Sequence, residues 1–132
     1  MRTRPALTAT DVQKMMAACK TEAQKNKWNV TIAIVDDSGA ALLLERMDGA
    51  GPISATVAMD KALTSALTRR PTKFWEDRVK EKPAFVTFPA GAMFQGGLPV
   101  MHQGECVGAI GVSGVQSHED EQVAQAGVAA LG

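Results

Sequence analysis

The polar residues with the clearest chemical potential are one acid and two bases. Asp48 ends the segment Arg46-Met47-Asp48, and Lys61 and Arg69 follow in an otherwise apolar stretch. Their spacing of eight positions places Lys61 and Arg69 close to one face of a helix. One interpretation is a structural ion pair plus an arginine at a helix end. The other is a cationic wall for a ligand carboxylate, with Asp48 as a proton acceptor.

The two histidines are further candidates for proton transfer, because an unperturbed imidazole titrates near neutrality. His102 precedes a Gln-Gly-Glu turn, and His118 precedes three carboxylates. Both positions are typical of surface histidines, and His102 is also a candidate catalytic residue if the protein is an enzyme. The sequence places no third ligand beside either of them and so specifies no metal site.

Glycine is concentrated in the range Pro83–Val115, which holds seven of the twelve glycines. Gly96, Gly97 and Gly114 would let another backbone or a flat ligand approach closely. The stretch 111–114 lacks the spacing of a nucleophile elbow, and no dinucleotide-binding glycine pattern is present. We therefore expect a glycine-lined surface rather than a nucleophilic serine or a nucleotide site.

Length and composition predict one domain over residues 1–132. The chain is 45% hydrophobic and 21% charged, which supplies enough apolar surface for one core and excludes disorder. Fourteen basic and fourteen acidic residues leave no net charge, whereas nucleic-acid binding requires a basic excess. The longest apolar runs, such as Val30–Val35, are too short to cross a bilayer. We expect no nucleic-acid partner and no membrane association.

The N-terminal residues and the cysteines indicate a cellular compartment. Met1–Pro5 is basic, but a polar helix follows it instead of the apolar core of a signal peptide. Cys19 and Cys106 lie 87 positions apart without a ligand cluster around either, which is typical of buried thiols in a reducing environment. We therefore expect a cytoplasmic protein.

Hydrophobic periodicity predicts an α/β (α+β) domain. A capping box at Thr8–Asp11 begins the first helix, and Ser117 is the expected cap of the last. The helices are expected at about 8–26, 52–70, 73–82 and 117–131, and the strands at about 30–36, 40–46, 98–102 and 106–112, with 84–89 as an added edge strand. Because hairpins join adjacent strands, a central antiparallel sheet with helices packed on it is the expected arrangement.

Several segments in one order resemble the GlcG/HbpS family. That family is also labelled the haem-degrading-like domain, and it includes the C-terminal domain of the PduO-type cobalamin adenosyltransferases. The resemblance runs from about Leu7 to Leu131. The segments that carry it are Leu43–Ala50, Ala58–Leu63, Arg69–Pro71, Gly96–Val100, Gly108–Gly114 and Asp120–Gly127.

The resemblance implies a profilin-like domain with a five-stranded antiparallel sheet that assembles into dimers and octamers. It also implies haem binding in some members, with a histidine ligand on the first helix. Here that helix has no histidine and offers Met15, Met16 and Cys19. Met15 and Met16 are thus the possible haem iron ligands, and they are equally suited to a core.

The leading hypothesis is a cytoplasmic, self-associating protein that binds a small ligand, either haem or another carboxylate-bearing molecule. An enzyme is the alternative, a tautomerase, isomerase or lyase acting on a keto or hydroxy acid. Asp48 or His102 would then move the proton, and Lys61 or Arg69 would stabilise an enolate. A third possibility is a scaffold without catalysis. The candidate ligand-binding residues are Arg46, Met47, Asp48, Lys61, Arg69, Gly96, Gly97, Leu98, Pro99 and Gly114.

Overall fold

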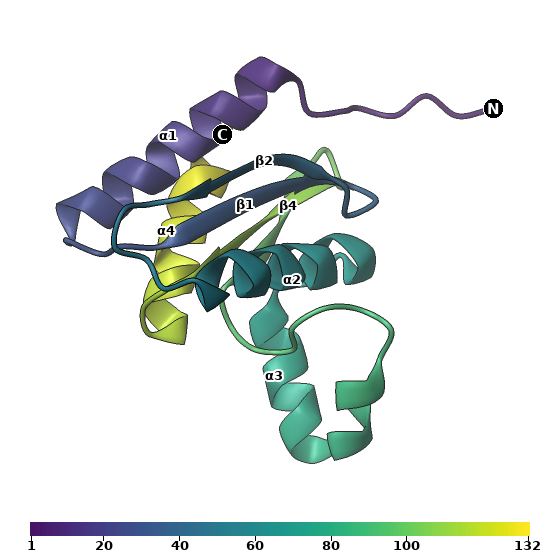
Figure 1. The fold of residues 1–132 in the computed structure, drawn as a ribbon. Coiled ribbons are helices and arrows are strands. Elements are labelled where there is room, and N and C mark those ends of the chain that lie inside the picture. The colour runs from purple at the N-terminus through teal and green to yellow at the C-terminus, as the bar shows by residue number, and fades with distance from the viewer.

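Four helices and one antiparallel sheet make up the computed structural model, which describes residues 1–132 (Figure 1). The helices are α1 (Ala9–Lys25), α2 (Ile53–Thr68), α3 (Thr72–Glu81) and α4 (Ser117–Ala129), with a short 3-10 helix, η1 (Pro83–Thr87). The strands are β1 (Thr31–Asp36), β2 (Ala41–Arg46), β3 (Gly97–His102) and β4 (Glu105–Ser113). Helices α1, α2 and α4 flank the sheet, and α3 projects away from it (Figure 1). The predicted α+β class and helix order are confirmed.

The sheet has the order β2-β1-β4-β3, and every neighbouring pair is antiparallel. Two hairpins, β1–β2 and β3–β4, meet along β1 and β4 at its centre. These central strands are buried on both faces, which explains why their sequences are apolar without alternation.

The sheet has four strands, so the expected fifth strand was wrong. Residues of the expected strand 84–89 form η1 and the turn after it instead. The rings of Phe85 and Phe88 pack against Trp75 of α3, with centroid separations of 5.6 and 4.9 Å. Because these aromatic contacts are made within the α3–η1 arm, they hold the segment away from the free edge of β3.

The two faces of the sheet carry different helix layers. Helices α1 and α4 cover one face over the larger core cluster, which contains Met15, Met16 and Ile110. Helix α2 covers the other face (Figure 1), where the buried side chains are mostly alanine. Small side chains let the backbone of α2 lie close to β1 and β4, as its alanine-rich sequence predicts.

Capping boxes begin the first and the last helix, α1 and α4, whereas α2 and α3 begin without a side-chain cap. The predicted capping box of α1 is confirmed, because the Thr8 hydroxyl accepts from the Asp11 amide and the Asp11 carboxylate accepts from the Thr8 amide. Helix α4 is capped one residue earlier than predicted, by Gln116 with Glu119. None of the helices combines the length and the apolarity of a bilayer-spanning segment.

Gly111 tests the close packing of α2 on the sheet. A methyl group at Gly111 would overlap the Ala58 carbonyl and lie 2.5 Å from the Ala62 amide nitrogen, both in the α2 backbone. Because a helix backbone yields little, we expect Gly111→Ala to reduce the free energy of unfolding by about 2–3 kcal/mol. Gly51→Ala is the matched control, since no atom lies within 4 Å of the added methyl. Urea denaturation of both variants measures this, and equal stabilities would contradict it.

Candidate functional site

The structure separates the predicted ligand-binding residues from one another. Arg46, Met47 and Asp48 line one surface hollow. Lys61 lies in the protein interior, and Arg69 lies at the far end of α2. The glycines of the candidate set contact the chain's own backbone and side chains. They do not form one pocket.

Lys61 does not form a ligand wall, which corrects one of the two interpretations of its position. Its side chain is 1% exposed, and its Nζ donates to Asp120 Oδ2 at 3.0 Å and to the Val112 carbonyl at 2.9 Å. The Phe94 ring lies over it, with 4.7 Å from Nζ to the ring centroid. The buried ammonium donates to two protein groups and faces an aromatic ring, so it is not presented to a substrate enolate in the solvent.

Burial dominates the titration of this pair. Removal from water lowers the pKa of Lys61, and the nearby Asp120 carboxylate offsets part of that effect. The same removal from water raises the pKa of Asp120, against the attraction of Lys61. The Lys61–Asp120 pair therefore has a structural role, because either residue without the other would be an uncompensated buried charge.

Gly96 and Gly97 make room for Lys61 rather than for a flat ligand. A side chain on Gly96 would lie 2.5 Å from Lys61 Nζ, and one on Gly97 would lie 2.6 Å from the Lys61 carbonyl oxygen. The Gly97 amide also donates to Thr72 Oγ1 at 2.9 Å. Leu98 is buried and Pro99 is half-buried in β3. The close approach that Gly96 and Gly97 permit is therefore made by α2 of the same chain and not by a ligand.

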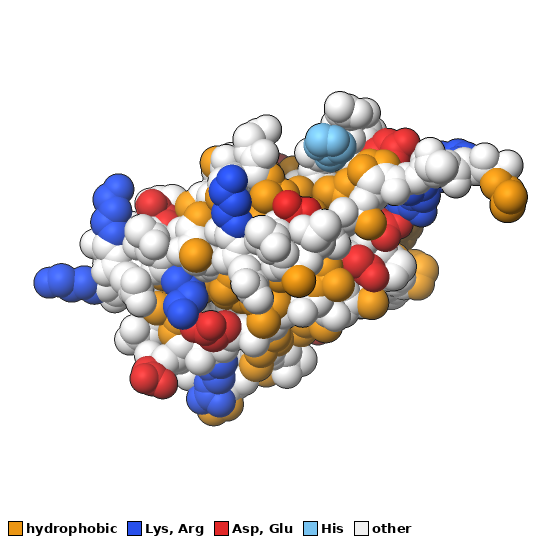
Figure 2. Space-filling model, turned by 90° about the horizontal axis from the view of Figure 1, so that it is seen from above, with side chains coloured by type: hydrophobic (Ala, Val, Ile, Leu, Met, Phe, Trp, Pro, Cys, Tyr) orange, Lys and Arg blue, Asp and Glu red, His pale blue; other side chains and the backbone are white.

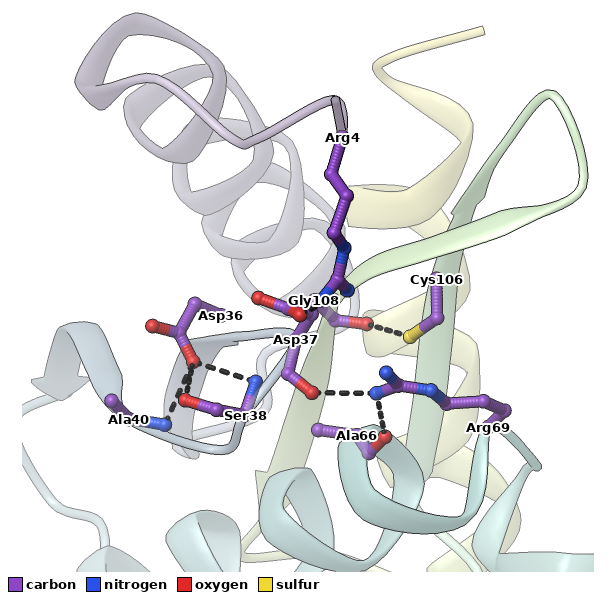
Figure 3. A network of polar contacts seen from close by, with 9 residues as sticks. All are labelled: Arg4, Asp36, Asp37, Ser38, Ala40, Ala66, Arg69, Cys106 and Gly108. Atoms are coloured by element: carbon purple, nitrogen blue, oxygen red, sulfur yellow. Dashed lines mark hydrogen bonds and ion pairs between the residues drawn. The ribbon is translucent and has the colours of Figure 1, made fainter. Parts of the chain in front are cut away.

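Gly114 and Arg69 also have structural contacts. Gly114 has a positive φ of 143° and packs against the Asn29 carbonyl in the segment before β1. Arg69 ends α2 in the left-handed conformation, and its Nη1 donates to the carbonyls of Ala66 and Asp37, each at 2.5 Å (Figure 3). Arg69 therefore ties the end of α2 to the β1–β2 turn.

The methionines of α1 are core residues. Met15 and Met16 are buried in the cluster between α1, α4 and the sheet. Cys19 lies in the same cluster, and burial raises the pKa of its thiol to about 12. A haem outside the protein cannot reach these sulfur atoms without opening the core, so α1 does not fit the role of an iron-ligand helix.

A hollow of about 280 Å³ lies where the N-terminal segment, the β3–β4 hairpin and the end of α4 meet. We call it the apolar hollow, because seven of its eleven lining residues are hydrophobic. Its lining is Pro5, Ala6, Leu7, Asp11, Val100, Met101, His102, Val107, Val128, Leu131 and Gly132. His102 is exposed there, as expected of a surface histidine.

His102 has a carboxylate nearby in the same hollow. The pKa of Asp11 is lowered mainly by hydrogen bonds from the backbone and hydroxyl of Thr8, and the charges of Lys14 and His102 lower it further. Sequence reasoning identified His102 but missed its neighbours, because Asp11 lies 91 positions away along the chain.

A second hollow, of about 380 Å³, lies at the opposite end of α1. We call it the polar hollow, because Met47 is its only hydrophobic lining residue. It is lined by Lys20, Gln24, Asn29, Glu45, Arg46, Met47 and Asp48. Three of the predicted ligand-binding residues therefore do share one concavity, together with four residues that the sequence did not indicate.

The molecular surface is mixed in charge. On the face shown in Figure 2, basic and acidic side chains are interspersed, with hydrophobic side chains between them. No group of three or more His, Cys, Asp or Glu side chains is placed to hold a metal ion. The apolar and polar hollows are the candidate binding sites, because each of them contains predicted site residues.

Comparison with known proteins gives consistent matches over nearly the whole chain. Residues 7–129 match the family model described as haem degrading protein HbpS-like. Protein GlcG of Escherichia coli strain K12 is 45% identical over 114 residues, covering 86% of this chain and 85% of GlcG.

Solved structures show the same fold. A double mutant of Streptomyces reticuli HbpS superposes with a TM-score of 0.93 at 36% identity, covering 100% of this chain and 91% of that chain. The complex of PduOC with haem superposes with a TM-score of 0.88 at 27% identity, covering 96% of this chain and 95% of that chain.

Removing one member of the buried pair tests its structural role. Lys61→Met leaves the Asp120 carboxylate buried without a cation, and we expect a loss of about 3–5 kcal/mol in the free energy of unfolding. Lys61→Met combined with Asp120→Asn removes both charges, so its loss should be smaller than the sum of the two single losses. A double-mutant cycle by chemical denaturation measures the difference, and strict additivity would contradict a coupled pair.

The pH dependence of Lys61→Met has a defined sign. The Asp120 carboxyl, whose pKa burial already raises, loses its compensating ammonium in this variant. The folded state then takes up a proton at a higher pH than the unfolded state does. The variant should therefore gain stability as the pH falls from 7 towards 5. Thermal unfolding across that range measures this, and a loss of stability on acidification would contradict it.

Proposed function

Because this chain belongs to the HbpS-like family, we propose that it binds haem, or another flat carboxylate-bearing molecule, in the apolar hollow beside His102. The observation that carries this proposal is an exposed imidazole at an apolar concavity, with a carboxylate near it. Relatives whose structures and names refer to haem support the choice of ligand.

The residues of the apolar hollow suit a porphyrin. Leu7, Val100 and Val128 supply apolar contacts for a ring edge, and His102 supplies a nitrogen that can ligate iron. Asp11 lines the same hollow, and its charge lies near enough to His102 to interact with it electrostatically. Haem held there would supply ligand binding or redox chemistry at its iron.

Self-association belongs to the same proposal. A hollow of about 280 Å³ is at the small end of ligand pockets and would leave part of a porphyrin uncovered. A second copy of the chain could cover the remainder, in an assembly between a dimer and an octamer. Exposed large hydrophobic side chains support such an assembly, namely Leu42, Leu44, Ile53, Leu67, Val86, Phe88, Phe94 and Met101.

Spectroscopic haem titration tests the site. We expect a Soret band on addition of haem to the purified protein. In His102→Ala, the band should shift because the proposed iron ligand is lost, and the affinity should fall at least about tenfold, or ~1.4 kcal/mol. Absorption between 350 and 700 nm measures both.

Two variants serve as controls. His118→Ala removes the other histidine, which is exposed at the start of α4 and lies outside the apolar hollow. Met16→Leu removes a first-helix thioether while nearly conserving core volume. Both should keep the wild-type band. A band lost in Met16→Leu but kept in His102→Ala would overturn the proposed site, and no Soret band in the wild type would overturn haem as the ligand.

A further inference from the structure

The polar hollow contains two opposite charges that the protein leaves unpaired. Of its four charged side chains, Lys20 and Glu45 pair with each other at 2.8 Å. Asp48 has neither a hydrogen bond nor an ion pair, and Arg46 forms no ion pair. The unpaired groups are therefore one guanidinium and one carboxylate, both exposed and both lining one concavity.

Arg46 is held at the base of its guanidinium. Its Nε donates to the Ala50 carbonyl at 3.0 Å, while its two terminal nitrogens have no protein acceptor. This contact limits the motion of the side chain but leaves free the pair of donors that binds a carboxylate in a bidentate manner. The Arg46 side chain is thus held in place while its terminal nitrogens remain free to donate hydrogen bonds to a ligand.

The backbone beneath Arg46 and Asp48 is fixed by the fold. The Met47 amide donates to the Val30 carbonyl at 3.0 Å, and the Ala50 amide donates to the Met47 carbonyl at 3.1 Å. Gly49 has a φ of +87°, and a side chain there would lie 2.8 Å from Nδ2 of the Asn29 side chain. The turn therefore packs closely against Asn29, and little ordering of this loop is needed when a ligand binds.

We propose that the polar hollow binds a small zwitterionic acid of the α-amino acid class, with its carboxylate on Arg46 and its ammonium on Asp48. The side chains of the hollow sum to zero charge, because Lys20 and Arg46 balance Glu45 and Asp48. A zwitterion keeps that balance, whereas a simple anion adds a negative charge beside two carboxylates. Met47 supplies one apolar contact for a short side chain.

This site is independent of the haem proposal. The polar hollow lies at the C-terminal half of α1 and the end of β2, whereas His102 lies on the hairpin at the other end of the sheet. The two hollows share no lining residue. Failure of haem binding would leave the zwitterion proposal standing, and the reverse also holds.

Three ligands with one carbon skeleton separate the contributions of the two charges. L-Alanine, L-lactate and propionate share the carboxylate and differ in carrying an ammonium, a hydroxyl or neither. The Met47 methyl resonance of methionine-labelled protein, assigned with Met47→Leu, reports occupancy of the hollow. We expect alanine to bind at least about fivefold more tightly than lactate, and propionate to bind most weakly, because only the ammonium makes a charge-assisted hydrogen bond.

Variants then assign the contacts. Arg46→Gln should weaken binding of all three ligands at least about tenfold, because each places its carboxylate there. Asp48→Asn should remove the preference for alanine over lactate. Arg2→Gln, which replaces a basic residue outside both hollows, should bind alanine as the wild type does.

Two results would overturn the inference in different ways. If none of the three ligands shifts the Met47 resonance, or if Arg46→Gln binds them unchanged, the hollow is not a carboxylate site. If propionate binds as tightly as alanine and Asp48→Asn changes nothing, the hollow binds simple acids and the ammonium assignment is wrong.

Discussion

The contact between the Lys61 ammonium, the Asp120 carboxylate and the Val112 carbonyl joins the three layers of this protein. Lys61 lies on α2, on one face of the sheet, and Asp120 lies in the first turn of α4, which covers the other face. Charges with side chains only 1% and 3% exposed are costly unless they are paired. Moving α2 away from α4 would separate the two charges and leave each of them buried without its partner. The free-energy cost of that separation fixes the position of α2 relative to α4.

Close backbone packing follows from that contact. Lys61 can reach across only if α2 lies close to β4, and Gly111 permits this by having no side chain towards Ala58 and Ala62. Gly96, which precedes β3, leaves the space that Lys61 Nζ occupies. Gly96, Gly111 and the alanines of α2 thus meet one requirement, which is that α2 lies close to the sheet. Their spacing in the sequence looks like room for a ligand, but it accommodates the chain itself.

The elements of the fold were predictable because their signals are local. The capping box at Thr8 and the alanine-rich period of α2 each depend on residues within one element. The expected strand at 84–89 was wrong because Trp75, on another element, determines its conformation. Apolar character alone cannot distinguish a strand from a segment that packs on a neighbouring helix.

The site was predictable only where its residues are contiguous. Arg46 and Asp48 lie in one short segment, whereas Lys20 and Asn29 reach the same hollow through tertiary structure. The partner of Lys61 left a weak signal, because Asp120 shares the buried helical face of Ala124 and its neighbours. A carboxylate on such a face requires a buried cation, and Lys61 is the only basic residue in the apolar part of α2.

The two hollows differ because opposite ends of the sheet expose different parts of it. At one end, the β3–β4 hairpin meets the N-terminal segment and the end of α4, and His102 lies beside apolar side chains there. At the other end lies the C-terminus of β2. This strand is at an edge of the sheet, and its last two residues are the charged Glu45 and Arg46. The same rigid core supports both, so ligand chemistry at each end can change through a few peripheral residues without altering the buried pair that holds the layers together.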